Sequence, residues 1–457
     1  MAGIGFELAK LWKHGSFQSL LRAYSLTAMM GSGPGLFIII SLGIVCFFTL
    51  FATPASLVAY QFLSVITYLL STSMIVSACL QYTFFRFLAD KIFSKEFNQV
   101  TPNFIGVLLI QLIMSLCIAI PVIFYFFSSH SLSLKVLLLS NFIILCMIWL
   151  SIVMLTGLKA YRLIIWGSAL GYYTMIIVHF LWPRNDIVAL LFEFLLAQAI
   201  LFVFLLHAIL DYYPTNQCIK FDFLKKENFY YTLVFSNFFY SLGFWIDKYL
   251  FWFNRDTSFV IFSPLRLSPL YDLPMFIAYL TIIPTTAVFL LRIEANFSLV
   301  YPKFMETIFN RKSLAEINAV RNELVVAGRF AVFGLFKTQA AMVVIMFLLA
   351  CFIFSVFKIL PIYLNLLFIL IVAVGLNVVL WGLLNILYYM TQYLHAFYVS
   401  LLFVLSNFTF TLLSLHAGPS FFGYGFSLSL VLSIACALIF LNRGFNNLEY
   451  TTFTTTD

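Results

Sequence analysis

The sequence predicts an all-α polytopic membrane protein with about twelve transmembrane helices. Apolar residues make up 63% of the 457 residues, against roughly 45–50% in a typical soluble domain. Charged residues make up only 9%, against roughly 25% in an ordinary globular protein. The apolar residues also fall in runs long enough to cross a membrane, which takes about 20 residues. This composition excludes a soluble enzyme, a disordered chain and a secreted disulfide scaffold.

Twelve apolar runs meet this length, and each is expected to form one transmembrane helix. They are 24–51, 57–85, 104–127, 134–157, 161–182, 187–210, 229–253, 270–291, 330–356, 360–384, 396–415 and 421–441. Pro274 and Pro284 lie inside the eighth run and predict a bent helix there, because proline removes a backbone hydrogen-bond donor.

Basic residues predict the orientation of the chain. If the N-terminus is cytoplasmic, 19 of the 25 Lys and Arg residues lie on the inner side and 5 on the outer side, while Lys248 lies within a span. Lys and Arg concentrate in cytoplasmic loops of membrane proteins. We therefore expect both termini to be cytoplasmic.

Polar segments divide the chain into five parts. They are an N-terminal amphipathic cytoplasmic segment (1–23), a first six-helix lobe (24–210), a cytoplasmic linker (211–228), a second six-helix lobe (229–442) and a cytoplasmic tail (443–457). The second lobe contains a polar loop, 293–329, whose apolar residues recur at helical spacing. This spacing favours an amphipathic helix on the inner membrane face over a solvated connector. Because this loop is the only sizeable polar segment, we expect it to dock cytoplasmic partners or the inner leaflet, with Arg311, Lys312 and Arg321 as the candidate partner-docking residues.

The motifs of enzyme chemistry are missing from the sequence. It has no H-E-x-x-H zinc motif, no phosphate-binding loop and no dinucleotide fingerprint. The six histidines form no evident cluster with carboxylates, and the seven cysteines form no C-x-x-C pair. We therefore expect neither enzymatic activity nor a cofactor or metal site.

Polar and ionisable residues in or beside the predicted spans are the first indication of a functional site. A charge at the centre of a transmembrane helix costs about 2.5–3.5 kcal/mol, so such residues usually face a cavity or a partner. The candidate residues of a transport path are Asp247, Lys248, Glu193, Arg266, Asp272 and Asn237. For Glu193, pairing with another group for stability explains the position as well as a role in the path does. For Lys248, snorkelling to the membrane interface is favoured over a role in the path.

Asp247 and Lys248 are adjacent, and neighbouring helical residues point about 100° apart. We therefore expect Asp247 to have another partner, such as Arg266, a helix N-terminus or water in a cavity.

A glycine-proline cluster is the second indication of a site. Gly31, Gly33, Pro34 and Gly35 are expected to break the first span. The seventh span opens the second half and carries polar residues, and irregular segments at matching positions of two halves mark the central site of many transporters. A close helix contact, or a loop before the first span, is the alternative explanation of the cluster.

Four stretches of the sequence are distinctive: M-A-G-I-G-F-E-L at 1–8, W-I-D-K at 245–248, S-P-L-R-L-S-P-L-Y-D-L-P at 263–274 and G-P-S-F-F-G-Y-G-F at 418–426. With these stretches, the chain resembles the PelG family of the Pel exopolysaccharide systems over nearly its whole length. The chain departs from the family's pattern at Gly35, where a tryptophan is expected.

This resemblance implies a fold like that of the flippases of the multidrug/oligosaccharidyl-lipid/polysaccharide (MOP) exporter superfamily, with two six-helix lobes. It implies an inner-membrane transporter that moves an amino-sugar exopolysaccharide for the biofilm matrix from cytoplasm to periplasm. It also implies a cytoplasmic glycosyltransferase and membrane partners, among them a cyclic-di-GMP receptor. The alternatives are an ion-coupled exporter of a lipid-linked or small substrate, with Asp247 or Glu193 as the coupling carboxylate, and a membrane scaffold for the polysaccharide synthase.

Overall fold

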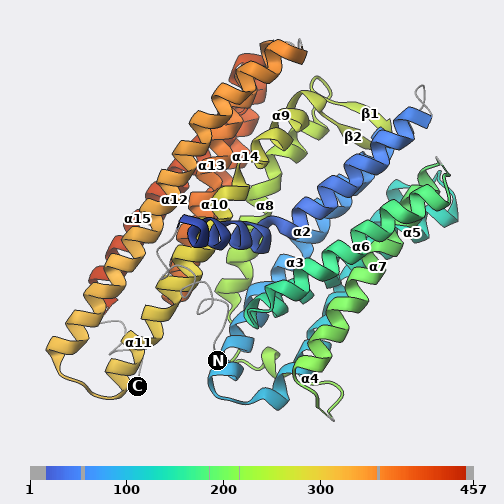
Figure 1. The fold of residues 1–457 in the computed structure, drawn as a ribbon. Helices are drawn as coiled ribbons and strands as arrows, with labels where there is room; N and C mark the ends of the chain where they lie inside the picture. Colours follow the sequence, from blue (N-terminus) through green and yellow to red (C-terminus); the bar gives the residue numbers. More distant parts are fainter. Residues whose placement is uncertain (1–16, 53–56, 185, 216, 358–360, 449–457) are drawn as a thin grey trace. The chain divides into compact units, whose positions relative to one another are not determined.

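The computed structural model describes residues 17–52, 57–184, 186–215, 217–357 and 361–448, and most of them are helical (Figure 1). The all-α fold predicted from the sequence is therefore confirmed. Most of the predicted N-terminal amphipathic segment, residues 1–16, lies outside the described residues. Residues 449–457 of the predicted tail also lie outside them.

The chain separates into two compact units. Unit 1 comprises Met1–Ser32, Ile246–Phe251 and Pro269–Asp457, and unit 2 comprises Gly33–Trp245 and Trp252–Ser268. Each unit groups residues by their contacts and combines several segments of the chain, whereas each predicted lobe is one continuous segment that ends or begins at residue 210 or 229. The two divisions therefore do not coincide. That predicted division stays a prediction.

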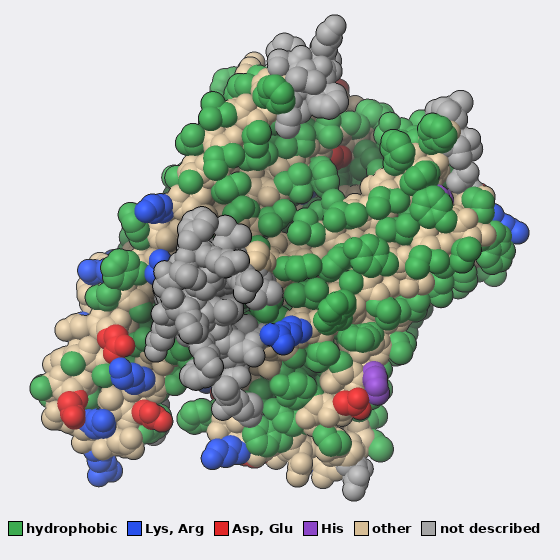
Figure 2. All heavy atoms as spheres, in the orientation of Figure 1, with side chains coloured by type: hydrophobic (Ala, Val, Ile, Leu, Met, Phe, Trp, Pro, Cys, Tyr) green, Lys and Arg blue, Asp and Glu red, His purple; other side chains and the backbone are tan. Residues whose placement is uncertain are grey.

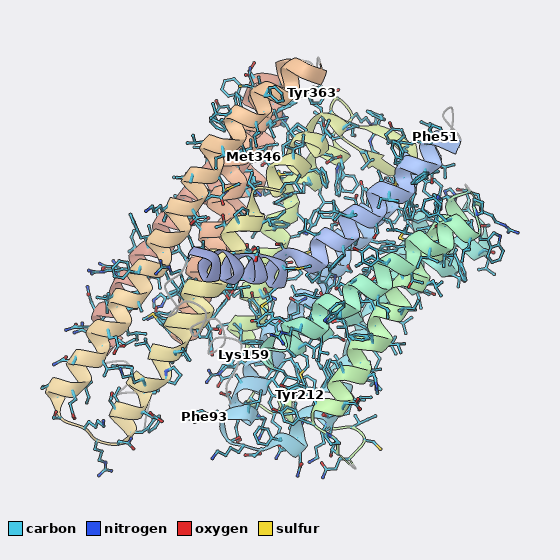
Figure 3. The ribbon with its side chains drawn as sticks, in the orientation of Figure 1. Phe51, Phe93, Lys159, Tyr212, Met346 and Tyr363 are labelled. Carbon is cyan, nitrogen blue, oxygen red and sulfur yellow. The ribbon has the colours of Figure 1, made fainter. Side chains whose placement is uncertain are left out.

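Unit 2 is built from helices that run the length of the unit. The complete helices are α3 (Val58–Phe93), α4 (Val100–Phe126), α5 (Leu132–Gly157), α6 (Tyr161–Leu181) and α7 (Ile187–Tyr212). The unit also includes the larger parts of α2 (Phe17–Ala52) and α8 (Tyr231–Phe253). Short 3₁₀ turns lie at Phe97–Gln99 and Asp222–Leu224. Figure 3 places Phe93, Lys159 and Tyr212 at one end of these helices and Phe51 at the other. Helices that alternate in direction, joined by short connections, produce this arrangement.

Two glycines let α6 and α7 pack closely. A Cβ atom at Gly171 would lie 2.7 Å from the backbone oxygen of Ala197, and one at Gly167 would lie 2.7 Å from Phe204 Cδ1. Small residues allow helix backbones to approach in membranes, where helix association depends on van der Waals packing. These glycines therefore explain why two largely apolar helices form one of the most extensive contacts in unit 2.

A β-hairpin also belongs to unit 2. It pairs β1 (Phe259–Phe262) with β2 (Leu265–Leu267) in antiparallel register, Phe259 opposite Leu267. The Tyr68 hydroxyl donates to the Arg266 carbonyl at 3.0 Å, which ties the hairpin to α3. The hairpin lies in the connection between the predicted spans 229–253 and 270–291.

Unit 1 contains the remaining helices. They are α9 (Pro269–Tyr279), α10 (Ile282–Phe289), a π-helix (Leu290–Phe297), α11 (Ser298–Phe309), α12 (Leu314–Phe357), α13 (Pro361–Tyr389), α14 (Tyr393–Ala417), a 3₁₀ turn (Pro419–Phe421) and α15 (Tyr424–Asn446). α13 is the most buried of the spans and packs against α9, α12 and α15. A Cβ atom at Gly375 of α13 would lie 2.5 Å from Gln339 Cγ of α12, so any other residue here would require the Gln339 side chain to move.

Ten helices among the described residues are long and apolar enough to cross a membrane, or eleven if the bent pair α9–α10 forms one span. The bend in that pair is 42°, which confirms the bent element predicted from its prolines. The predicted seventh span forms α8, but this helix is not in the set. Its polar residues, among them Asn237, Asp247 and Lys248, lower its mean hydropathy.

The polar loop predicted at 293–329 is a helical hairpin of α11 and α12. Residues 314–329 do not form a separate amphipathic helix, because α12 continues unbroken for 44 residues, past Met346 (Figure 3). Ser313 and Glu316 start it with a reciprocal cap: the Ser313 amide donates to Glu316 Oε2, and the Glu316 amide donates to Ser313 Oγ. Figure 2 shows charged side chains gathered over α11 and the start of α12.

Candidate functional site

A buried cluster of polar groups lies around Asp247 in unit 1. The Asp247 side chain is fully buried, and the Tyr271 hydroxyl on α9 donates to its Oδ2 at 2.6 Å. The Lys248 ammonium donates to Oδ1 at 3.1 Å. The expectation that Asp247 has a partner besides its neighbour Lys248 is confirmed, although that partner is Tyr271 and not Arg266, which the sequence suggested as one example. The long, flexible lysine stem lets the Lys248 ammonium reach Asp247, although neighbouring helical residues point about 100° apart.

Lys248 does not snorkel to an interface. It is 3% exposed, and its ammonium lies 5.4 Å from the ring centre of Tyr279 and 5.2 Å from that of Phe426. An ammonium over an aromatic face is attracted by the ring's negative charge density, more strongly when both are removed from water. Two rings and one carboxylate thus replace the water that a lysine loses on burial.

The surroundings of Asp247 are aromatic. Phe251 stacks on Tyr271 with ring centres 3.9 Å apart and planes within 11°, and Phe422 meets Phe251 edge-on at 5.0 Å. Asp272 follows Tyr271, is half-buried, and adds negative charge to the environment of Lys248. The structure therefore brings together three of the predicted site residues: Asp247, Lys248 and Asp272.

Glu193 of unit 2 has a partner that the sequence analysis missed. His179 Nδ1 on α6 lies 3.1 Å from Glu193 Oε2 on α7, and both side chains are almost fully buried. The sequence showed no evident cluster of histidines with carboxylates, and this single pair was not predicted. The topology could have indicated this pair. Because α6 and α7 are antiparallel and joined by a short connection, residues near the end of α6 and near the start of α7 lie at similar depth.

A second polar contact continues along the same helix pair. Gln198 Nε2 on α7 donates to the Tyr172 hydroxyl on α6 at 2.9 Å. We call the four side chains of Tyr172, His179, Glu193 and Gln198 the α6–α7 seam.

The other two predicted path residues make structural contacts within unit 2. Asn237 Nδ2 donates to the Ala78 carbonyl at 2.8 Å, which joins α8 to α3. Arg266 donates from Nε to Ser258 Oγ and from Nη2 to the Ser258 carbonyl, each at 2.8 Å, which fixes the base of the β-hairpin. Both residues belong to unit 2, whereas Asp247 belongs to unit 1.

The glycine-proline cluster does not interrupt α2. The helix runs without a gap from Phe17 to Ala52 and contains Pro34. The prediction that these residues interrupt the helix is therefore wrong. Proline removes only one backbone donor, and a helix of this length retains its other hydrogen bonds. The boundary between the two units nevertheless falls within this cluster, between Ser32 and Gly33.

The three predicted docking residues differ in their surroundings. Arg311 and Lys312 are exposed in the turn that joins α11 to α12. Arg321 is half-buried, and its Nη2 lies 3.4 Å from the Phe445 carbonyl and 3.5 Å from the Asn446 carbonyl, at the end of α15. The turn is therefore available to a partner, whereas Arg321 is already engaged within unit 1.

The linker after α7 is held on unit 2 through Asp222. The Asp222 amide donates to Asn103 Oδ1 at 2.7 Å, and Lys225 forms an ion pair with the Asp222 carboxylate at 2.7 Å. The hydrogen bond from Lys225 holds the pKa of Asp222 below its usual range, and a bond that Asn103 Nδ2 donates to Asp222 Oδ2 at 3.2 Å adds to the effect. In the described part of the chain, no group of three or more His, Cys, Asp or Glu side chains is arranged to hold a metal ion.

Comparison with known proteins links this geometry to a family. A family model described as "PelG: Putative exopolysaccharide Exporter (EPS-E)" matches residues 1–453. No curated protein matches the chain. Among solved structures, the chain is similar to an outward-facing multidrug resistance MATE family transporter of the MOP superfamily. The identity is 14% and the TM-score 0.66, covering 96% of this chain and 98% of that one.

Two further structures give the same result. A MOP superfamily transporter from Pyrococcus furiosus has 14% identity and a TM-score of 0.65, covering 94% of this chain and 96% of that one. A MATE protein in a bent conformation has 13% identity and a TM-score of 0.64, covering 95% and 96%. Identities this low establish the fold alone, which is the two-lobe helical fold of MATE and MOP transporters. The match over nearly the whole sequence shows more: the chain belongs to the PelG family.

Proposed function

We propose that this protein is an inner-membrane transporter that moves an amino-sugar exopolysaccharide from the cytoplasm to the periplasm for the biofilm matrix. The observation that carries the proposal is the family match over residues 1–453, on a chain with the fold of MOP transporters. In this role the protein is not an enzyme and needs no cofactor. Its work is to let a polymer cross the bilayer without chemical change.

The arrangement of buried charge supports transport without catalysis. Asp247 is paired with Lys248, and Glu193 with His179. Paired charges lower the cost of placing ionisable groups inside a membrane protein. A path role for Asp247 requires that its contacts with Tyr271 and Lys248 open during transport, because the carboxylate is fully buried in this structure.

We also propose that both termini are cytoplasmic and that the α11–α12 turn, residues 310–313, binds the cytoplasmic partners. These partners would be a glycosyltransferase and membrane proteins that include a cyclic-di-GMP receptor. The length of α12 supports this proposal, since 44 residues extend about 66 Å at about 1.5 Å per residue. The hydrocarbon core is only about 30 Å thick, so about half of α12 extends beyond it.

Deletion of the protein in cells that retain the synthase tests the proposed function. A transporter predicts that polymer is made and accumulates inside the cell. A scaffold for the synthase predicts that polymer synthesis itself stops. An ion-coupled exporter of an unrelated small or lipid-linked substrate predicts normal polymer outside the cell, which would contradict the proposal.

A further inference from the structure

The linker between α7 and α8 is in direct contact with α4. The Lys220 amide donates to the Pro102 carbonyl at 3.0 Å, near the start of α4. A Cβ atom at Gly106, one turn further along α4, would collide with the Lys220 carbonyl oxygen. Glycine at this position therefore lets the two backbones touch. Residues 217–228, which we call the linker segment, are thus held against the first turns of α4.

Two further contacts fix the linker segment in unit 2. Asp222 exchanges hydrogen bonds with Asn103 of α4, as described above. Phe223 is 1% exposed and packs edge-on against Phe84, with ring centres 5.9 Å apart, and against Phe87 at 6.3 Å. The linker segment is therefore a fixed part of unit 2, and it presents a defined set of side chains to its surroundings.

These contacts place the linker segment at the edge of the hydrocarbon layer. Helix α4 has 27 residues, so it is about 40 Å long at about 1.5 Å per residue. Centred on a hydrocarbon core of about 30 Å, it extends about 5 Å beyond each side. Gly106 lies about 9 Å from the start of α4. The Lys220 backbone beside it is therefore at the level where lipid headgroups meet acyl chains.

Three large apolar side chains of the linker segment are exposed. Ile219, Phe221 and Leu224 have exposed fractions of 45%, 44% and 45%. Lysines lie among them in the sequence, at Lys220, Lys225 and Lys226. A lysine stem can lie on an apolar surface while its ammonium group reaches a polar headgroup. This combination is typical of amphipathic segments that lie at the boundary between headgroups and acyl chains.

The connection from α3 to α4, residues 91–96, adds to the charge of this surface, since Glu96 and Asp222 interact electrostatically. Together with the linker segment, it contains five lysines and three acidic residues. Lys91 pairs with Glu96 at 2.9 Å, and Lys225 pairs with Asp222 at 2.7 Å. The charge that remains is positive, and lysines beside a membrane attract anionic lipid headgroups.

Exposed aromatic residues at the same end of unit 2 favour lipid over a partner protein. Figure 3 places Phe93 and Tyr212 at this end, and their exposed fractions are 83% and 44%. Aromatic side chains are enriched where a membrane protein meets the headgroup layer. The exposed apolar side chains of the linker segment, which follows Tyr212 in the chain, extend this interfacial band.

We propose that the linker segment is a binding site for anionic phospholipids of the inner leaflet. Ile219, Phe221 and Leu224 contact the upper part of the acyl chains, and the lysines contact the phosphate groups. The inference uses the cytoplasmic location proposed for the linker and does not depend on the transported substrate.

Quenching of a fluorescent label at Cys218 by brominated lipids tests the proposal. Cys218 is exposed within the linker segment, so bimane can be attached there in a full-length variant whose other six cysteines are replaced by Ser. The protein is reconstituted in vesicles of phosphatidylcholine or phosphatidylglycerol that carry bromine on their acyl chains. The control carries the label at Arg311→Cys, with Cys218→Ser, in the exposed α11–α12 turn.

We expect both brominated lipids to quench the label at Cys218, and phosphatidylglycerol to be preferred by about fivefold for each lysine that contacts it. The label at residue 311 should not be quenched. Lys220→Gln with Lys226→Gln should remove most of the preference while retaining the Lys225–Asp222 ion pair. Arg311→Gln with Lys312→Gln removes the same charge elsewhere and should leave the preference unchanged.

Three results would overturn the proposal. Absence of quenching at Cys218 would place the linker segment in water, and equal quenching by the two lipids would exclude the headgroup contact. Loss of quenching on addition of the purified glycosyltransferase would assign the surface to a protein partner. If the variant that lacks the other cysteines does not fold, thermal unfolding decides. The wild type should unfold at a higher temperature in phosphatidylglycerol than in phosphatidylcholine, and a difference that persists in the Lys220→Gln, Lys226→Gln protein would overturn the proposal.

Discussion

Tyr271 on α9 donates a 2.6 Å hydrogen bond to Asp247 on α8, and the same carboxylate accepts a second bond from Lys248. Asp247 is therefore held by one neighbour in sequence and one from another helix. This arrangement makes the carboxylate a structural tie between α8 and α9 as well as a candidate transport residue, and the two roles predict different results on substitution.

Replacing Tyr271 by Phe removes the hydroxyl and retains the ring that stacks on Phe251. We expect a loss of about 1.5–3 kcal/mol in the free energy of unfolding, because the lost hydrogen bond is to a charged group. Thermal unfolding in detergent measures the effect. Tyr173→Phe is the control, since Tyr173 is 51% exposed. Equal stability of the two variants would contradict the tie.

Changes at Asp247 and Lys248 should not be additive. Asp247→Leu removes the carboxylate that pairs with the buried ammonium, and breaking a buried ion pair from one side destabilises a protein by about 3–5 kcal/mol. Adding Lys248→Met should recover part of that loss, as measured by protein abundance and unfolding. Asp247→Asn separates the roles: reduced export at normal abundance supports a transport path, and normal export removes Asp247 from it. Additive losses in the double variant would argue against the pair.

The sequence predicted the positions of the spans and the bend at Pro274 and Pro284, because both follow from local apolarity and from proline geometry. It did not predict the pairing of His179 with Glu193, because that contact depends on how α6 and α7 rotate against each other. The continuity of α12 through residue 329 was also missed. The change from polar to apolar composition near residue 329 suggested that one helix ends there and another begins. The helical hydrogen bonds of α12 nevertheless continue across this position.

Attachment of the linker to α4 should weaken in acid. Lys225 and Asn103 lower the pKa of Asp222 in the folded state, so this contact stabilises the fold above the unfolded pKa of about 3.9. The contribution is lost as the pH falls through the folded pKa. Hydrogen exchange in residues 217–228 should therefore become relatively faster below about pH 4, and Asp222→Asn should show fast exchange already at neutral pH. Exchange in that variant equal to wild type at neutral pH would contradict the anchor.

Charge reversal at the α11–α12 turn should weaken partner binding. Arg311 and Lys312 are exposed, so replacing both by Glu should leave the unfolding temperature unchanged while lowering co-purification of the glycosyltransferase. Arg321→Glu is the comparison, because it breaks contacts with the end of α15 and should lower stability as well. Undiminished co-purification with the first variant would place docking elsewhere.

Whether this protein exports the polymer can be measured in inverted inner-membrane vesicles. Vesicles that contain the synthase and its partners are given a labelled nucleotide-sugar precursor, and a glycosidase is then added outside. We expect labelled polymer to become protected inside the vesicles when this protein is present, and to stay degradable when the protein is absent. Polymer that is equally degradable in both preparations, or equally protected in both, would contradict export by this protein.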